Sequence, residues 1–530
     1  MPDDCSTYAY SSFFSPLIHD YLQEKEQLKP LYHRFPKLEN FKAQLDEKAT
    51  NYPTHFRDVL ANTLDSQYQN ITTSEETQRN LARLRQTNTF TITTGHQLNI
   101  GTGPLYFIYK IISTINLCKQ LQETYPDQHF VPVYWMATED HDLAEINHLF
   151  VKNQKVVWHK QGTGAVGRLD TEGMEQVIAE IHVLLGSSEV SQELIALFTN
   201  AYLSSATLTE ATRKLVNNLF GQYGLVIIDG DSRELKSLFT PHIQNELATQ
   251  FSFAAVNEST ALLQEYKIQV NPREINLFYL DNNLRERIVF ENNRYKVLNT
   301  TLEFSAEQIQ HLAANEPEKF SPNVLLRPLY QEVILPNLCY IGGGGELAYW
   351  LELKLMFAKA HVTFPVLLLR NSVVIASSKT KAKWDKTPLE WEDLFLTPRE
   401  LTAQFLSKTT TNTVDFTDLK QQLASQFSAL HDQATATHPS FLSMLKAQEV
   451  KQNKGLTALE KRLQKAQIKA NQESIDRILA IQNEVFPNQS LLERKTNFSD
   501  YYHTFGAVFI EKLLSQLDPL HMKFTSLFLD

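Results

Sequence analysis

The alternation of β-branched runs, glycine-rich turns and amphipathic stretches in the middle of the chain is typical of an α/β protein. Residues 90–94 form a β-branched run that ends at Gly95, and the apolar residues of 105–121 have helical spacing. A second apolar run at 131–137 ends on a group of acidic residues. The order strand, loop, helix, strand is the βαβ unit of a parallel sheet. The same pattern predicts further strands at 225–228, 275–280, 339–341 and 366–369.

Helical patterns flank this central region. Residues 1–85 carry apolar side chains one turn apart and no clear strand, and residues 151–224 have the mixed pattern of an insertion. Residues 415–486 are rich in Gln, Lys, Glu and Ala, with apolar residues at intervals of three and four. An antiparallel helical hairpin, a coiled coil and an ordinary amphipathic bundle all fit that spacing. The apolar residues that begin this three-and-four spacing are Leu456, Leu459, Leu463, Ala466 and Ala470.

We therefore predict an α/β fold with a Rossmann-like parallel-sheet core at 86–380, into which a subdomain is inserted at about 151–224. The N-terminal helical segment, 1–85, is expected to pack on this core. A C-terminal helical domain is expected at 381–500, followed by a segment at 501–530 that returns to the core.

Composition and charge narrow the classes of function. The 530 residues exceed what one hydrophobic core usually holds, and 42% hydrophobic with 21% charged residues is typical of a globular protein. A net charge of -10 argues against a nucleic-acid partner, and no apolar run has the length of a membrane span. Cys5, Cys118 and Cys339 are too few for a disulfide framework, and no secretory signal is visible. We expect a cytoplasmic protein that binds neither nucleic acid nor membranes.

A glycine-rich turn joins the first strand to the following helix. Backbone amides at a helix start attract phosphate or carboxylate groups, and Gly101 and Gly103 would let a ligand approach the backbone. Tyr106 stands where the third glycine of the dinucleotide fingerprint belongs, so a simple tight connection is an alternative. The polar neighbours His96 and Gln97 favour a binding role. The candidate nucleotide- or anion-binding residues of this turn and helix are Gly95, Gly101, Thr102, Gly103, Tyr106 and Lys110.

Four consecutive ionisable residues, Glu139, Asp140, His141 and Asp142, follow the second strand, where open α/β sheets bind ligands. If the strand continued through them, Glu139 and His141 would share one side and Asp140 and Asp142 the other. Burial beside like charges would raise the pKa of one carboxyl and suit it to act as a general base. A solvated turn with an N-cap at Asp142 is one alternative, and a metal site is another. The spacing matches no strong metal motif, so we predict none.

Arginines and a second glycine run suggest recognition of an anion. Four glycines at 342–345 precede a helix whose first turn holds Glu346, and Arg327 is suited to binding a carboxylate with two hydrogen bonds. Arg273, Arg285 and Arg287 lie around a strand and hairpin, where a salt-bridged surface is the simpler alternative. The further candidates are Gly343 and Gly344 for an anion, and Gln97, Asp142, Asn276, Gln331 and Tyr349 for substrate.

Four long segments, in order over about residues 90–357, resemble the BshC family, the cysteine ligases of bacillithiol biosynthesis. They read TTGHQLNIGTGPLYFIYK, VPVYWMATEDHDLAEINH, REINLFYL with RERI, and RPLYQEVILPNLCYIGGGGELAYW. Leu492-Glu493-Arg494 resembles a short motif that follows the coiled-coil domain of that family. The chain departs at His96, where many members carry glutamine, and at Gly344, where proline is frequent.

The resemblance implies a Rossmann-like core, a helical coiled-coil domain and a homodimer. It also implies a carbon–nitrogen ligase that joins cysteine to the amine of glucosaminyl malate, the last step of bacillithiol biosynthesis. The carboxyl must be activated, so we expect ATP or ADP to bind, although the HIGH and KMSKS signatures are absent. We assign the base that deprotonates the amine to Asp140 or His141, and the malate carboxylates to Arg273, Arg285 or Arg327. The catalytic candidates together are His96, Glu139, Asp140 and His141.

Two other classes of function remain open. One is a nucleotide-binding transferase or a metal-dependent hydrolase that uses the acidic residues on an anionic small molecule. The other is a coiled-coil scaffold whose α/β domain senses a metabolite without catalysis.

Overall fold

The computed structural model describes residues 13–409 and 415–530, and its core is a five-stranded parallel sheet. The strands are β1 (Thr89–His96), β2 (His129–Met136), β5 (Val226–Asp229), β11 (Asn337–Gly342) and β12 (Val366–Leu369), in the order β12-β11-β1-β2-β5. The chain builds outward from β1 to β5 on one side and then adds β11 and β12 on the other. The predicted α/β fold is confirmed. Such a reversal leaves a crevice between β1 and β11 at the carboxyl ends of the strands.

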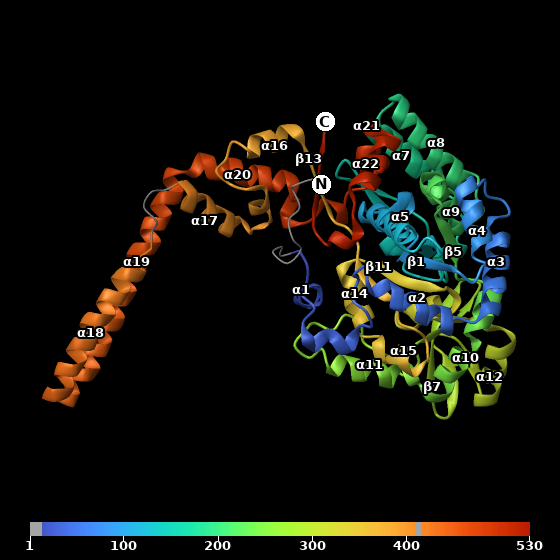
Figure 1. Ribbon diagram of the computed structural model, residues 1–530, viewed down its shortest axis with the longest axis horizontal. Coiled ribbons are helices and arrows are strands. Elements are labelled where there is room, and N and C mark those ends of the chain that lie inside the picture. Colours follow the sequence, from blue (N-terminus) through green and yellow to red (C-terminus); the bar gives the residue numbers. More distant parts are fainter. Residues whose placement is uncertain (1–12, 410–414) are drawn as a thin grey trace. The chain divides into compact units, whose positions relative to one another are not determined.

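Helices cover both faces of this sheet (Figure 1). Helix α5 (Tyr106–Thr124) connects β1 to β2 and packs on both, and α2 (Asn40–Asn51) packs on β11. Phe90 and Ile92 of β1 lie in the hydrophobic cluster with these helices, together with the buried thiols of Cys118 and Cys339. Thr93, on the opposite face of β1, donates to the Asn337 side-chain oxygen at 2.9 Å. Cys5 lies outside the described residues.

The segment before β1 is helical over its described part, with no strand in residues 13–85. Two tyrosine hydroxyls attach it to the sheet region: Tyr21 donates to the Leu367 carbonyl and Tyr52 to the Ile334 carbonyl, both at 2.7 Å. The other helices of this segment are α1 (Pro16–Leu22), α3 (Thr54–Tyr68) and α4 (Glu75–Arg83).

The insertion between β2 and β5 contains a hairpin and three helices that lie side by side (Figure 1). These are β3 (His148–Val151), β4 (Gln154–Val157), α7 (Met174–Leu185), α8 (Glu189–Leu203) and α9 (Leu208–Phe220). In the later part of the chain, α21 (Ser499–Phe505) contacts α8, and α22 (Ala507–Gln516) contacts α5.

A second, antiparallel sheet follows β5, and it contains the strand predicted at 275–280. That strand, β6 (Leu277–Asp281), pairs with β7 (Leu284–Glu291) and lies outside the parallel core. The remaining strands of this sheet are β8 (Arg294–Val297), β9 (Glu303–Phe304) and β10 (Phe320–Pro322). The helices of this region are α10 (Arg233–Thr249), α11 (Phe251–Ala261), α12 (Ala306–Asn315), α13 (Leu326–Ile334), α14 (Gly344–Leu351) and α15 (Lys354–Lys359).

The described chain divides into two compact units. The first comprises residues 13–373 and 492–525, and the second comprises residues 374–491 and 526–530. The segment expected to return to the core therefore divides between the units, because the last strand, β14 (Thr525–Leu529), pairs with β13 (Val373–Ser377). Among the described residues, no helix is both long and apolar enough to traverse a membrane.

Apart from the strands β13 and β14, the second unit is helical, and α18 (Thr417–Thr437) and α19 (Pro439–Ala470) form a long hairpin within it (Figure 1). The buried residues between them are Phe427, Ala434 and Leu445. Leu459 and Leu463 of the predicted stripe are 55% and 45% exposed, so this stripe is not the contact within the hairpin. The other helices are α16 (Ser378–Trp384), α17 (Pro398–Thr409) and α20 (Gln472–Val485).

Candidate active site

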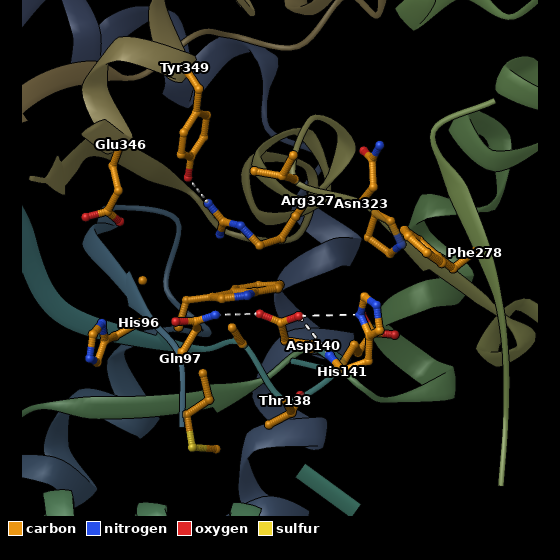
Figure 2. A pocket seen from close by; sticks show the side chains of 18 of the residues that line it. His96, Gln97, Thr138, Asp140, His141, Phe278, Asn323, Arg327, Glu346 and Tyr349 are labelled. Atoms are coloured by element: carbon orange, nitrogen blue, oxygen red, sulfur yellow. Dashed lines mark hydrogen bonds and ion pairs between the residues drawn. The ribbon is translucent and has the colours of Figure 1, made fainter. Parts of the chain in front are cut away.

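A cavity of about 650 Å³ opens at the carboxyl edge of the parallel sheet. Its walls come from the ends of β1 and β2, the loop after β5, helices α13 and α14, and the second sheet. Figure 2 shows residues from these elements pointing toward one another across the cavity. Most of the predicted site residues line it: Gly95, His96, Gln97, Tyr106, Lys110, Glu139, Asp140, His141, Arg273, Arg285, Arg327, Glu346 and Tyr349.

The glycine turns themselves do not line the cavity. Gly101 and Gly103 have φ of +57° and +68°, and their carbonyls accept hydrogen bonds from the Asn497 side chain at 2.8 and 2.6 Å. The Gly101 N–H donates to the Tyr202 hydroxyl at 2.7 Å. This turn, with Thr102, is a tight connection held by distant side chains, so its placement does not support the expected anion site. The second turn, at Gly343 and Gly344, begins α14, and the Gly343 N–H donates to Glu346 of the same helix at 2.9 Å.

Three other predicted residues do not line the cavity. The Asn276 side-chain oxygen accepts from Asn323 at 2.8 Å, and the Gln331 side-chain oxygen accepts from Arg327 at 3.0 Å. Both partners line the cavity, so these amides orient residues that face it. Asp142 caps the short helix α6 (Leu143–Ile146) by accepting from the Glu145 N–H at 3.2 Å, which confirms the N-cap that the sequence offered as an alternative role.

Lys110 and Glu346 form a buried ion pair that joins α5 to α14. The ammonium donates to both carboxylate oxygens at 2.9 and 2.7 Å, and also to the Gly95 carbonyl. The Tyr340 hydroxyl donates to the same carboxylate at 2.7 Å. Burial works to raise the pKa of Glu346, but Lys110 and the Gly343 N–H outweigh it and the pKa is lowered. Glu346 therefore stays ionised, and its charge balances that of Lys110.

Asp140 is held as a carboxylate by hydrogen bonds. Gln97 Nε2 donates to Asp140 Oδ2 at 2.8 Å, and the His141 N–H donates to Oδ1 at 2.8 Å (Figure 2). Burial alone would raise the pKa of Asp140, yet the bonds from His141 and Gln97, with the charge of Arg285, keep it well below its usual range. Strand β2 ends at Met136, so the condition for the alternation of sides is not met. Asp140 is a weak base whose oxygens already have donors.

His141 has one ring nitrogen occupied. Its Nδ1 lies 2.8 Å from a guanidinium nitrogen of Arg285 and 3.6 Å from Asp140 Oδ1. A guanidinium only donates, and 3.6 Å is too long for a hydrogen bond, so Nδ1 accepts from Arg285. This contact fixes the tautomer of a neutral ring with its proton on Nε2.

Glu139 has the opposite electrostatic environment from its neighbour Asp140. Its side chain is 12% exposed and forms an ion pair with Lys236, whose side chain is 1% exposed. Burial, aided by the nearby Asp231, raises the pKa of Glu139 to about 7 even though Lys236 opposes the shift. Adjacent carboxyls with separated pKa values are typical of sites that transfer protons.

His96 is neutral at physiological pH. Burial, with a smaller contribution from Lys110, lowers its pKa to about 3. Its ring packs 5.5 Å from that of Tyr106 and 5.0 Å from that of Phe107, and its Nε2 makes no hydrogen bond within the described chain. A neutral imidazole is a polar lining residue and does not supply positive charge to an anion.

Positive charge is in excess around the cavity. Arg327 donates to Gln331 and to the Tyr349 hydroxyl, at 3.0 and 3.3 Å. Arg285 stacks over Phe278, with its guanidinium carbon 4.1 Å from the ring centre. Throughout the described residues, no carboxylate lies within 4.0 Å of the guanidinium of any arginine in the cavity wall. These four arginines are Arg273, Arg285, Arg287 and Arg327.

The carboxylates of the cavity leave this excess uncompensated. Glu346 and Glu139 are each paired to a lysine, and the amide of Gln97 donates to Asp140. No cluster of three or more His, Cys, Asp or Glu side chains suited to a metal ion is present in the part of the chain that the structure describes. The cavity therefore fits an organic ligand with more than one negative charge.

Lys236, which pairs with Glu139 behind the cavity wall, was not among the residues that the sequence predicted for the site. It lies near the start of α10, and its side chain is buried with those of Phe239 and Ile243, three and seven positions further on. A lysine at i of an apolar i, i+3, i+7 pattern falls on the buried face of a helix, where it needs a charged partner. That spacing was the available signal.

Comparison with known proteins agrees with the resemblance seen in the sequence. Residues 1–371 match the N-terminal Rossmann-like domain of bacillithiol biosynthesis BshC, and residues 373–529 match its C-terminal coiled-coil domain. A relative from Flavobacterium johnsoniae is 52% identical over 99% of both chains. Relatives from Christiangramia forsetii and Cytophaga hutchinsonii are 48% and 40% identical, over 99% and 96% of this chain and 98% and 95% of theirs. Each carries the name "Putative cysteine ligase BshC". The chain belongs to the BshC family of bacillithiol biosynthesis.

Proposed function

We propose that this protein joins the carboxyl group of L-cysteine to the amine of glucosaminyl malate and so forms the amide of bacillithiol. The observation that carries the proposal is the set of four arginines in the cavity wall without carboxylate partners among the described residues. Malate brings two carboxylates, which would compensate that excess of charge. The cavity volume, about 650 Å³, lies within the range of small-molecule sites.

Amide formation from a free carboxylate requires activation of the carboxyl carbon. We propose that ATP provides it, through an acyl-adenylate or acyl-phosphate of cysteine. The amine must also lose a proton before it can attack, so the site needs a base within reach of the cavity. Glu139, Asp140 and His141 are the candidates that line it.

The test is incubation of the purified full chain with L-cysteine, glucosaminyl malate, ATP and magnesium, followed by mass spectrometry. We expect bacillithiol, and much less amide when glucosamine without malate replaces the sugar substrate. Reactions without ATP, and with other nucleotides, identify the activating agent. Absence of bacillithiol under every nucleotide and metal condition would refute the proposal. Release of phosphate without amide would favour the alternative of a transferase or hydrolase.

A further inference from the structure

A group of paired charges, most of them buried, lies behind the wall of the cavity and is centred on Lys236 of α10. Its ammonium contacts Glu139 Oε1, donates to the Glu318 carbonyl at 3.1 Å, and lies 3.6 Å from Asp231 Oδ1. Asp231 is bound in turn by the guanidinium of Arg168 with two hydrogen bonds, at 2.7 and 2.9 Å. Every charge in this group has a partner, so the position of Lys236 is well defined.

Only one member of this group reaches the cavity. Glu139 lines it, whereas Lys236, Asp231 and Arg168 do not. The carboxyl of Glu139 thus has one side on the ligand space and the other on a buried lysine. A charge partner that substrate cannot touch is suited to controlling the ionisation of the group that substrate does touch.

The other candidates for a base are occupied. Both oxygens of Asp140 accept hydrogen bonds, and Nδ1 of His141 accepts from Arg285. Glu346 accepts from Lys110, Tyr340 and the Gly343 N–H. In Glu139, the ion pair with Lys236 engages Oε1, and no other side chain of the described residues donates a hydrogen bond to the carboxylate.

We propose that Glu139 accepts the proton from the ammonium of the sugar substrate, and that Lys236 is the positioning residue that keeps Glu139 in its carboxylate form. This inference rests on the proposed ligase function. It assigns Glu139 as the proton acceptor of that function and Lys236, which lies outside the cavity, as the residue that acts through Glu139.

Proton transfer to Glu139 precedes formation of the amide bond. One N–H bond of the substrate ammonium breaks, and its proton forms an O–H bond on Glu139. The freed electron pair of nitrogen attacks the carbonyl carbon of the cysteine acyl-adenylate or acyl-phosphate, forming the C–N bond. The C–O bond to the leaving group breaks, and AMP or phosphate departs with that electron pair. The second proton of the attacking nitrogen leaves to solvent.

The charges around Glu139 predict how its ionisation responds to substitution. Burial raises its pKa to about 7, with Lys236 and Arg285 acting to lower it and Asp231 acting to raise it. Removal of Lys236 should therefore raise the pKa of Glu139, and removal of the Asp231 charge should lower it. The groups that interact with Glu139 are Lys236 from α10, Asp231 after β5, Arg168 from the turn Val166–Arg168, Arg285 from β7 and Tyr330 from α13.

The experiment is the pH dependence of kcat/KM for glucosaminyl malate between pH 5.5 and 9, at saturating cysteine and ATP. We expect the acid limb of the wild type near pH 7. Lys236→Met should move this limb upward by about one unit or more, which lowers the rate at pH 6 roughly tenfold and leaves the rate at pH 9 nearly unchanged. Lys236→Arg should restore the position of the limb, and Glu139→Gln should lower kcat about 100-fold or more.

Two further variants separate this role from a merely structural one. Asp231→Asn should move the limb in the opposite direction, to lower pH. Lys48→Met removes an equally buried lysine that pairs with Glu332 at 3.5 Å, away from the cavity, and should leave the limb in place. Ionisation of the substrate amine is the same for every variant, so a limb that moves belongs to the enzyme.

The outcomes distinguish the two proposals. If the wild type makes no bacillithiol at any pH, the ligase proposal fails. If the wild type is active but the limb is the same in the wild type, Lys236→Met and Asp231→Asn, the role of Lys236 is refuted. Circular dichroism checks that each variant folds. If Lys236→Met does not fold, Asp231→Asn decides the question: a limb that moves to lower pH supports the role of Lys236, and an unmoved limb refutes it. Lys236→Arg should then keep the limb where it is in the wild type.

Discussion

Substitution of Arg327 by methionine tests whether the cavity recognises the malate carboxylates. The guanidinium of Arg327 is held by Gln331 at 3.0 Å and Tyr349 at 3.3 Å, both neutral partners. Because no carboxylate of the described chain lies within 4.0 Å of it, its charge is free to bind a ligand anion. Methionine keeps most of the side-chain volume and removes the charge and the donors.

The size of the effect follows from the hydrogen bonds that would be lost. A hydrogen bond to a charged group contributes about 1.5–3 kcal/mol. At about 1.4 kcal/mol for each factor of ten, the KM for glucosaminyl malate should rise roughly 10- to 150-fold. The KM for cysteine should change little. Arg327→Lys should be intermediate, since lysine restores the charge without the planar pair of donors.

The assay is the initial rate of bacillithiol formation at varied glucosaminyl malate, with cysteine and ATP saturating. Arg233→Met is the matched control, because Arg233 is 55% exposed, pairs with Glu318 at 2.7 Å and does not line the cavity. Its KM should equal that of the wild type. If Arg327→Met and Arg287→Met both keep KM within twofold of the wild type, the arginines do not recognise malate and the reasoning is refuted.

Three further predictions concern other parts of the chain. His96→Gln should keep the ligase rate within a few-fold and leave its pH profile unchanged, because the pKa of His96 is about 3 and the ring carries no charge above pH 5. Loss of a limb of the wild-type pH profile in this variant would contradict the prediction. Burial raises the pKa of Glu352 from 4.5 to about 7, although a hydrogen bond from the Gln269 N–H opposes this shift. The folded state therefore binds this proton more tightly than the unfolded state, and the free energy of unfolding that Glu352 contributes declines as pH rises through that range. Glu352→Gln should therefore raise Tm, relative to the wild type, more at pH 8 than at pH 5, and an equal change at both would count against it. We propose that the exposed Leu459 and Leu463 contribute to a homodimer of twice the 60.9 kDa chain mass, so that their joint replacement by glutamate should yield monomers in light scattering.

The local pattern was sufficient to find the cavity because parallel strands end at one edge of a sheet. Gly95 and Glu139 each follow a strand that the sequence identifies, and adjacent parallel pairing of β1 and β2 brings the two segments together. Arg285 belongs to a different sheet, and Arg273 lies in the loop before the first strand of that sheet; the sequence predicts this strand but not its pairing. Hydrophobic periodicity predicts that a strand exists, and it does not specify which sheet the strand joins.

Contacts between distant residues account for what the sequence did not predict. The turn at Gly101 and Gly103 has the composition of an anion site, yet its carbonyls are bound by Asn497, almost 400 positions away in the chain. The leucines of α19 have the spacing of a helical contact, yet those at 459 and 463 are exposed, and Leu445 lies in the hairpin instead. In both cases the local pattern fits two structures equally, and a partner far along the chain decides between them.

The acidic segment shows how one short stretch of sequence acquires separate roles. Glu139 and Asp140 are chemically alike and adjacent, but one faces a buried lysine and low polarity while the other accepts two N–H hydrogen bonds. The first therefore gains or loses its proton near neutral pH, and the second stays ionised there. If the chain acts as the proposed ligase, these separate properties let Glu139 accept a proton while Asp140 remains an ionised acceptor for Gln97. The segment provides them because its two carboxyls are solvated by different parts of the fold, the helix α10 and the end of β1.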